Sequence, residues 1–232
     1  MTIQTSPENW PWSTVQAAVC GLDIRLAQDH SALITAGAWQ SGARSIIGVK
    51  GIKQFPIGMP LDEVADFAAE TARGLGARVV FDCSNNSAFA SILAARFGSN
   101  PANVLVAGVI TNAGDHAAMP TPMMLSVGGL KSAIPRWTLS KRELIECVSA
   151  ESDGGTLRTG KCGDWEALRE ELSSMERTVR ASGSVAYSAP SGKHDDLIMA
   201  LALAVFGLRR IGGAASRRRA RRREPFGVGA WT

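Results

Sequence analysis

Paired cysteines, membrane-length apolar spans and an export signal are all missing from this sequence, and each absence argues against a class of protein. The 232 residues include four cysteines, none in a CxxC pair. This spacing indicates reduced thiols in a cytoplasmic protein and argues against a zinc site. The apolar run 197–208 has twelve residues, whereas a membrane helix needs about 20. Residues 1–12 show no basic-then-apolar pattern, so we expect no export signal.

Length and composition predict one globular domain with flanking segments. With 45% hydrophobic side chains, 232 residues can bury a substantial core. The formal net charge is +4, but residues 209–224 hold eight arginines and one glutamate, which leaves the rest of the chain near −3. We therefore divide the chain into an irregular leader over 1–17, a folded domain over 18–210 and a basic, arginine-rich tail over 211–232.

Short apolar segments with polar links dominate the first half of the chain and predict a sheet. Three of them follow one another through hairpin-length connections, which favours an antiparallel meander. The alternation of helix and strand that comes next favours parallel pairing with right-handed crossovers. We predict an α/β fold with a mixed five-stranded sheet, three antiparallel strands followed by two parallel ones, flanked by helices. The segments are strands over 17–26, 31–39 and 44–52, a helix over 61–74, a strand over 77–82, a helix over 87–97 and a strand over 103–110.

The second half of the chain predicts mainly helices. Residues 111–137 are rich in Gly, Pro and Met and allow no assignment. Ser140 with Glu143 has the capping-box spacing that begins a helix. A charged helix is expected over 164–179, followed by a strand over 184–187. Surface ion pairs on the charged helix are expected between Glu166 and Arg169 and between Glu176 and Arg180.

Residues 155–162 nearly match a phosphate-binding P-loop. Cys162 stands where the motif needs a Ser or Thr hydroxyl for Mg²⁺, no apolar strand precedes the segment, and no helix follows at once. We interpret the segment as a charged surface hairpin.

Two adjacent carboxylates, Asp195 and Asp196, stand immediately before the apolar run 197–208. That run is rich in Ala and Leu and apolar on all sides, which is typical of a helix inside a protein core. Both aspartates then lie in the first helical turn, where free N–H groups and the helix dipole favour negative charge. Taken alone, an acidic N-cap explains the pair as well as a functional site does.

Two further aspartates lie at strands, Asp23 in the first strand and Asp82 at the end of the 77–82 strand. Neighbouring strands lie about 4.8 Å apart, so these aspartates can meet if the strands are adjacent, and the last helix can add Asp195 and Asp196. Clustered carboxylates repel one another unless a cation offsets them. Oxygen ligands suit Mg²⁺ or Mn²⁺, and two such ions can cleave a phosphodiester. The set therefore predicts a two-metal-ion nuclease.

Several motifs in this order resemble the nuclease domain of phage terminase large subunits. The resemblance runs from about residue 18 to 210, and its last motif is the most specific. The motifs are Gly-Leu-Asp23-Ile with Asp29-His-Ser-Ala-Leu-Ile, Val-Val-Phe-Asp82, Leu-Ser-Lys141-Arg-Glu-Leu-Ile with Gly155-Thr-Leu-Arg158, and Gly-Lys-His194-Asp195-Asp196-Leu-Ile-Met-Ala-Leu-Ala-Leu-Ala.

The resemblance implies a ribonuclease-H-like fold and metal-dependent endonucleolytic cutting of double-stranded viral DNA concatemers during genome packaging. It assigns Asp23, Asp82 and one or both of Asp195 and Asp196 as catalytic metal ligands for Mg²⁺ or Mn²⁺. One departure is Ser84-Asn85-Asn86, which stands where family members commonly have a glycine-containing loop.

The same resemblance implies partners that this sequence does not contain. Seventeen leader residues cannot supply the packaging ATPase, so we expect that motor on another chain. The small terminase subunit and the portal are further expected partners, and a membrane is not. The implied location is the cytoplasm of a bacterial host, with transient attachment at the procapsid portal.

Other polar residues near the acids have two interpretations each. His194 can bind metal or orient the leaving group, or it is only a polar helix-start residue. Lys193, beside the acids, is the stronger candidate for a DNA phosphate contact, whereas Lys141 stands at an exposed helix start where cations are usually solvated. Asp29 is either a fourth acid or a turn residue.

The arginines of the tail, Arg217, Arg218 and Arg219 among them, fit attraction to DNA phosphates, and they fit an acidic partner surface equally well. Three other functions also remain open. A Holliday-junction-resolvase-like nuclease would use a similar acid set, and a non-catalytic DNA-binding or packaging-assembly module would use only the arginines. An actin-like phosphotransferase would need a duplicated domain, for which 232 residues is short.

Overall fold

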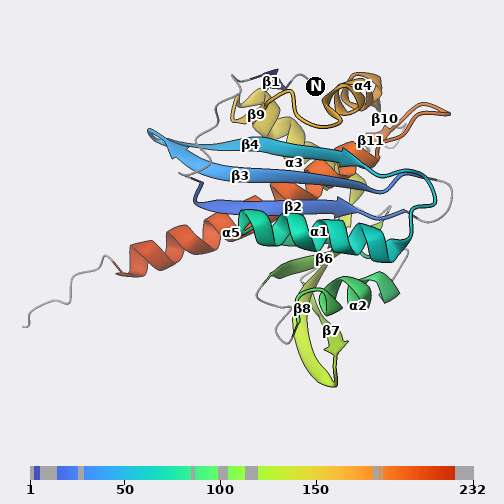
Figure 1. Cartoon of the computed structure of the whole chain (residues 1–232). Coiled ribbons are helices and arrows are strands. Elements are labelled where there is room, and N and C mark those ends of the chain that lie inside the picture. The colour runs from blue at the N-terminus through green and yellow to red at the C-terminus, as the bar shows by residue number, and fades with distance from the viewer. Residues whose placement is uncertain are drawn as a thin grey trace, which may run out of the picture.

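A mixed sheet of nine strands forms the centre of the molecule, in the order β1-β9-β4-β3-β2-β5-β6-β8-β7. The computed structural model describes residues 3–5, 15–25, 29–84, 87–98, 104–112, 120–179, 183 and 185–222, without the side chains of 4–5, 87, 105–106, 112, 130 and 210–222. Helices cover both faces of the sheet (Figure 1). The α/β fold class predicted from the sequence is therefore confirmed.

The predicted meander forms the middle of this sheet. Strands β2 (Ala17–Asp23), β3 (Ala32–Ser41) and β4 (Arg44–Gln54) pair antiparallel in sequence order. The β3–β4 turn needs Gly42, whose φ of 61° lies in the left-handed region that glycine tolerates.

Two parallel strands follow on the other side of β2, as predicted. Helix α1 (Leu61–Leu75) leads into β5 (Arg78–Asp82), and α2 (Ser87–Ala95) leads into β6 (Leu105–Asn112). Strand β5 pairs parallel with β2, and β6 pairs parallel with β5. Because β2 and β5 run parallel, their carboxyl ends lie next to each other at the same end of the sheet.

The prediction of five strands was too low, because the sheet continues at both edges. Residues 121–140, which overlap the unassigned region, form the hairpin of β7 (Thr121–Val127) and β8 (Leu130–Ser140), and β8 pairs parallel with β6. At the other edge, β9 (Leu157–Thr159) lies between β4 and β1 (Gln4–Thr5). These strands are short or interrupted by Pro and Met, so they lack the alternation that identifies a strand.

Strand β9 also corrects the interpretation of residues 155–162 as a charged surface hairpin. Leu157 and Thr159 are fully buried, and β9 runs parallel to both neighbouring strands. Leu157, between Thr156 and Arg158, belongs to a buried strand of three residues, which is too short for a periodic pattern to reveal.

The charged helix ends earlier than predicted. Helix α4 covers Trp165–Ser174, and β10 (Glu176–Val179) then pairs with β11 (Val185–Ser188) in a two-stranded sheet. The predicted Glu166–Arg169 pair is confirmed at 2.7 Å. The helical pair of Glu176 with Arg180 is wrong, because Glu176 lies in the strand; Arg180 is outside the described residues.

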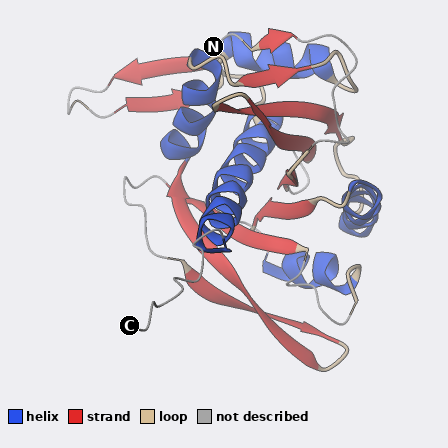
Figure 2. Ribbon diagram, turned by 90° about the vertical axis from the view of Figure 1, so that its left-hand side faces the viewer, coloured by secondary structure: helices blue, strands red, loops and turns tan. Residues whose placement is uncertain are grey.

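Helices α3 (Lys141–Asp153), α4 and α5 (Asp196–Arg222) cover one face of the sheet, and α1 and α2 cover the other. Figure 2 shows α5 lying across the sheet as the central helix of its layer. The predicted capping box is confirmed, since Ser140 and Glu143 exchange hydrogen bonds at the start of α3. Helix α5 is longer than the apolar run and continues to Arg222.

Glycine lets α5 approach the sheet closely. A Cβ atom added at Gly21 in β2 would lie 2.1 Å from the carbonyl oxygen of Ala200 and 2.4 Å from the nitrogen of Ala204. From the helix side, a Cβ at Gly207 would lie 2.7 Å from a Val80 methyl group and 2.9 Å from one of Val19. The helix axis is therefore fixed over β2 and β5, and with it the position of the helix start.

The four cysteines are free thiols, with Cys20 and Cys83 buried. Within the described residues, no helix has both the length and the apolar character needed to cross a membrane.

Candidate active site

Two aspartates meet where β2 and β5 end. Leu22 of β2 is in register with Phe81 of β5, so Asp23 and Asp82, each the next and last residue of its strand, lie side by side. Asp23 is fully buried and Asp82 is 6% exposed. The condition set by the sequence, that these two strands be adjacent, is therefore met.

Ser84 holds Asp82 in a tight turn. One oxygen of the Asp82 carboxylate, Oδ1, accepts hydrogen bonds from the Ser84 backbone N–H at 2.7 Å and from the Ser84 hydroxyl at 2.5 Å. The Ser84 hydroxyl oxygen also accepts from the Thr111 backbone N–H at 2.7 Å, which ties the turn to β6. Ser84 thus fixes one oxygen of Asp82 and leaves the other outside these bonds.

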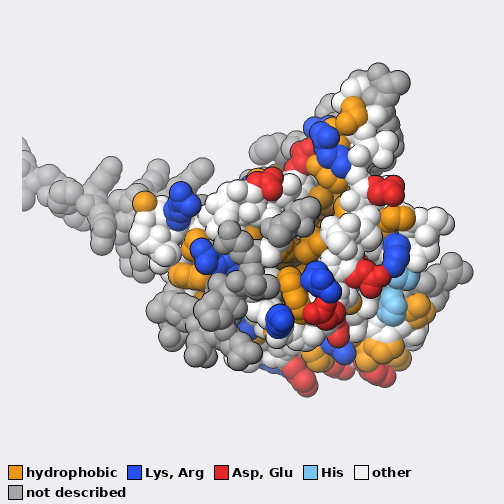
Figure 3. Space-filling view, turned by 90° about the horizontal axis from the view of Figure 1, so that it is seen from above, with side chains coloured by type: hydrophobic (Ala, Val, Ile, Leu, Met, Phe, Trp, Pro, Cys, Tyr) orange, Lys and Arg blue, Asp and Glu red, His pale blue; other side chains and the backbone are white. Residues whose placement is uncertain are grey.

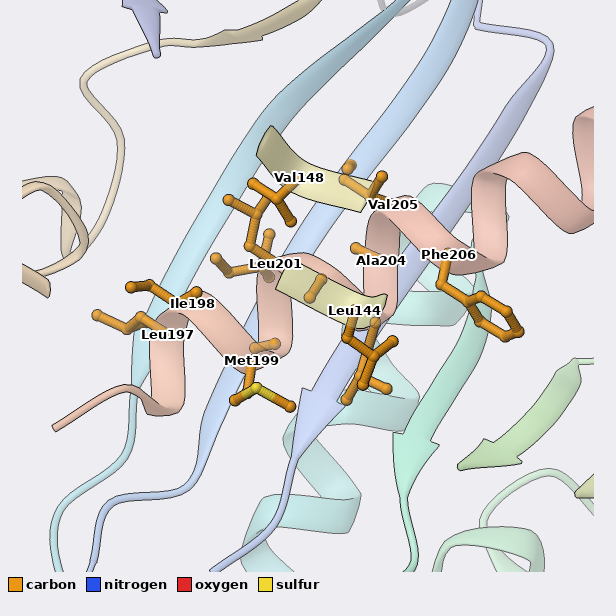
Figure 4. Packing of buried hydrophobic residues seen from close by; sticks show 14 of the residues in the cluster. Leu144, Val148, Leu197, Ile198, Met199, Leu201, Ala204, Val205 and Phe206 are labelled. Atoms are coloured by element: carbon orange, nitrogen blue, oxygen red, sulfur yellow. The ribbon is translucent and has the colours of Figure 1, made fainter. Parts of the chain in front are cut away.

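The start of α5 brings Asp195 and Asp196 to the same place. The helix begins at the end of the sheet where β2 terminates (Figure 1), and Asp196 is only 2% exposed. The apolar side chains that follow pack against Leu144 and Val148 of α3 (Figure 4). A helix anchored in this way holds its first turn in a defined position.

Arg25 joins these acids. Its Nε atom lies 3.2 Å from Oδ2 of Asp23 and 3.3 Å from Oδ1 of Asp196, and a terminal nitrogen lies 3.8 Å from Oδ1 of Asp195. The structure therefore brings all four predicted aspartates together, because Asp82 adjoins Asp23. Arg25 was not among the residues predicted from the sequence.

The sequence analysis favoured Lys193 over Lys141 as the lysine beside the acids, and the structure shows the reverse placement. Lys141, at the start of α3, forms an ion pair with Oδ2 of Asp195, so it stands at the acid cluster. Lys193 pairs with Glu170 on the outer surface of α4, where both side chains are largely exposed. Lys141 is therefore the lysine that the structure places at the site.

His194 lies at the rim of the cluster with Asp29. Its Nδ1 atom is 3.6 Å from a carboxylate oxygen of Asp29 and 3.8 Å from Oδ2 of Asp196. The rings of His30 and His194 meet edge to face, with their centroids 5.3 Å apart. Nδ1 of His30 lies 2.7 Å from the Phe55 carbonyl oxygen. In Figure 3, histidine side chains lie beside acidic and basic side chains at one end of the molecule.

Glu171 of α4 is a buried acid that the sequence analysis did not identify. It is 7% exposed, and its Oε2 atom accepts a hydrogen bond from the Ile198 backbone N–H at 3.0 Å. An acid from another helix thus caps the first turn of α5, while the carboxylate of Asp195 binds Lys141. Its position in the sequence could have indicated burial, because Glu171 falls on the apolar face of α4 with Leu168 and Leu172.

Burial shifts the ionisation of this cluster. Desolvation raises the pKa of Asp23 well above its ordinary range, with Arg25 acting in the opposite direction. Desolvation also raises the pKa of Asp196 to about 6 and that of Glu171 to about 7. For Arg25, burial lowers the pKa, but the neighbouring aspartates outweigh it and raise the value overall. Asp23, Asp196 and Glu171 therefore retain protons more readily than exposed carboxyl groups do.

Some predicted residues lie beyond what the structure describes. Arg217, Arg218 and Arg219 belong to the last part of α5, for which the backbone alone is described. Asn85 and Asn86 are outside the described residues.

The chemistry of the donor set fits a divalent cation. Two buried carboxylate oxygens, Oδ1 of Asp23 and Oδ2 of Asp196, have no hydrogen-bond partner among the described residues. Unpartnered carboxylate oxygens in a mixed polar site are the ligands that Mg²⁺ and Mn²⁺ prefer. In the described part of the chain, no three His, Cys, Asp or Glu side chains stand in positions that would hold one ion together. Side chains must therefore rearrange if a metal binds here.

Comparison with solved structures supplies the class of fold. The large terminase nuclease of the thermophilic phage G20c aligns with a TM-score of 0.54 at 18% identity, over 87% of this chain and 91% of that chain. The human cytomegalovirus terminase nuclease domain, soaked with Mn and bound to an inhibitor, aligns with a TM-score of 0.54 at 13% identity, over 91% and 92% of the two chains. The large terminase nuclease domain of bacteriophage SPP1 with bound Mn gives 0.51 at 12% identity, over 86% and 89%.

No protein-family model matches the sequence. No curated protein sequence matches it either. The structural likenesses, at such low identities, show that the chain has the ribonuclease-H-like fold of large terminase nuclease domains. The resemblance predicted from the motifs is therefore confirmed at the level of the fold.

Proposed function

We propose that the protein is a divalent-metal-dependent endonuclease that cleaves double-stranded viral DNA concatemers during genome packaging. The observation that carries the proposal is the convergence of Asp23, Asp82 and Asp196 at the ends of β2 and β5 and the start of α5, where two buried carboxylate oxygens have no hydrogen-bond partner among the described residues. The fold shared with large terminase nucleases supports it.

The residues of the cluster divide into ligands and positioning groups. Asp23 and Asp196 are the best metal ligands because each is buried and has an oxygen free to bind. Asp82 contributes the oxygen that Ser84 does not engage. Asp195 is the weaker ligand of the adjacent pair, because Lys141 neutralises it. Two bound Mg²⁺ or Mn²⁺ ions would supply activation of a water and stabilisation of the leaving oxygen of the phosphodiester.

Positive groups outside the cluster would hold the DNA backbone. Lys141 stands beside the acids, where its ammonium group can approach a phosphate next to the cleaved bond. The arginines 217–219 add a sequence-independent attraction to phosphates. A packaging ATPase on another chain, with the small terminase subunit and the portal, would present the DNA in the bacterial host cytoplasm. Cutting would then be controlled by position more than by base recognition.

The decisive experiment is cleavage of supercoiled plasmid by the purified chain in Mn²⁺, Mg²⁺ or EDTA. Asp23→Asn and Asp196→Asn should abolish nicking and linearisation in either metal. Asp66→Asn is the matched control, because it also removes one aspartate that pairs with an arginine, on the exposed face of α1. Its activity should equal that of the wild type.

Three results would overturn the proposal. Cutting that persists in EDTA, or that survives both substitutions, would exclude a carboxylate-bound metal as the catalyst. A wild-type chain that shifts plasmid on a gel without cutting it in either metal would instead indicate a non-catalytic DNA-binding module.

A further inference from the structure

The guanidinium group of Arg25 occupies the space between the carboxylates. One nitrogen, Nε, lies within ion-pair distance of both Asp23 and Asp196, and a second nitrogen lies near Asp195. A divalent ion shared by Asp23 and Asp196 would need to stand between the same two side chains. Arginine and metal therefore compete for one position.

Electrostatics explain why a cation belongs there. Asp23 is fully buried and Asp196 nearly so, and their negative charges repel each other and Asp82 in a region of low dielectric. An arginine beside them offsets this repulsion, because its delocalised charge is weakly hydrated and remains protonated when partly buried. It leaves one oxygen of Asp23 and one of Asp196 without a hydrogen bond, so its fit to the cluster is incomplete.

A cavity beside the cluster gives the arginine side chain a second place to lie. The cavity has a volume of about 310 Å³, and Arg25 itself lines it together with Asp29, Ser31 and the 56–61 segment. The Arg25 backbone N–H donates to the Ser31 hydroxyl at 3.1 Å, which anchors the main chain. The main chain is thus held at Arg25, while the cavity, which Asp29 also lines, offers the side chain an alternative position.

We propose that Arg25 is a resident counter-cation of the acid cluster, which a divalent metal ion displaces into the neighbouring cavity when it binds. The inference rests on the proposed function in one respect, that the acids bind metal. Arg25 holds the carboxylates together in the metal-free protein, and its displacement lowers the apparent affinity for the ion. In the metal-bound protein the freed guanidinium stands at the rim of the site beside Asp29.

Binding of Mn²⁺ measured by isothermal titration calorimetry at constant pH tests this directly, without a nuclease assay. Arg25→Ala should bind Mn²⁺ about tenfold more tightly than the wild type, equivalent to about 1.4 kcal/mol. Arg25→Lys keeps a positive charge and should stay within about threefold of the wild type. Arg96→Ala is the matched control, because Arg96 also bridges two aspartates, Asp62 and Asp66, and it should leave the dissociation constant unchanged.

Thermal unfolding in EDTA supplies the second readout. Arg25→Ala should unfold at a lower temperature than the wild type without metal, and saturating Mn²⁺ should restore most of the difference, because the ion replaces the lost charge. If Arg25→Ala does not fold, Arg25→Gln provides a neutral side chain of similar length for the same comparison.

The outcomes separate this inference from the proposed function. Mn²⁺ binding that Asp196→Asn abolishes, combined with unchanged or weaker binding in Arg25→Ala and Arg25→Gln, would overturn the role of Arg25 and leave the metal site intact. Tighter binding in Arg25→Lys equal to that in Arg25→Ala would also overturn it, because charge would not be the cause. Wild-type protein that binds no Mn²⁺ would overturn both.

Discussion

Substitution of Gly21 by alanine should displace the helix that carries the acid pair. The added Cβ would stand 2.1 Å from the Ala200 carbonyl oxygen and 2.4 Å from the Ala204 nitrogen. Both are backbone atoms of α5, so no side-chain rotation relieves the contact. Ordinary van der Waals contact begins at 3.4 Å, so the helix and β2 must separate by about 1 Å or more.

The size of the effect follows from the packing at this interface. Overpacking a buried site costs about 1–3 kcal/mol. For a domain of this length, that corresponds to a fall in the unfolding temperature of roughly 2–12 °C. Because Asp195 and Asp196 begin the displaced helix while Asp23 remains on β2, Mn²⁺ binding should weaken more than stability alone predicts.

Thermal unfolding and Mn²⁺ calorimetry on the same samples measure both effects. Gly74→Ala is the control: Gly74 lies in α1, and a Cβ there meets nothing within 4 Å. Its replacement should leave Mn²⁺ binding unchanged and raise stability by up to about 1 kcal/mol, because alanine favours a helix interior. A Gly21→Ala protein that unfolds at the wild-type temperature and binds Mn²⁺ normally would refute the close approach of α5 to β2.

Three further predictions concern the surroundings of the acids. Burial raises the pKa of Glu171 to about 7, so the contribution of this carboxyl group to the free energy of unfolding is present below about pH 4.5 and is lost as the pH rises through 7. Glu171→Gln should therefore flatten the decline in urea midpoint between pH 5 and 8. A decline as steep as that of the wild type would contradict this. Lys141→Ala should slow plasmid cutting about tenfold through loss of a phosphate contact, whereas Lys193→Ala should match the wild type in the same time course; equal losses would refute the placement of Lys141. Ser84→Ala should lower the free energy of unfolding by about 1–3 kcal/mol, because the Thr111 N–H loses its acceptor and Asp82 loses a donor; a urea midpoint equal to that of the wild type would show that these bonds contribute nothing.

Residues at the ends of buried strands were the part of the site that the sequence could predict. Asp23 and Asp82 each end an apolar run, so the sequence predicts that they meet if their two strands are adjacent. The adjacency itself comes from the structure, in which β5 pairs parallel with β2. The position of Asp196 at a helix start was also predictable, because a carboxylate that directly precedes an apolar helix lies at the start of that helix. The outer strands β7, β8 and β9 were missed, since their residues carry no regular alternation.

Arg25 and Glu171 could not be placed from the sequence because their roles depend on directions in space. Arg25 lies beyond the end of β2, and the turn after the strand decides whether its side chain points toward the acids or toward solvent. Glu171 caps a helix that begins 25 residues later, which no local spacing indicates. Lys193 is next to the acids in sequence, yet the chain there turns its side chain to Glu170 on α4.

The balance of charge in the cluster determines which ligand it accepts. Four aspartates face two cations, Arg25 and Lys141, so the fully ionised site carries an excess of two negative charges and repels a DNA phosphate. A proton on Asp23, whose pKa is raised by burial, halves that excess but cannot reverse it. A divalent cation offsets that excess as long as Arg25 remains at the rim of the site, so the site then no longer repels a phosphate. Metal should therefore bind before DNA, and DNA affinity near the cluster should rise with Mn²⁺ in the wild type and stay low in Asp196→Asn.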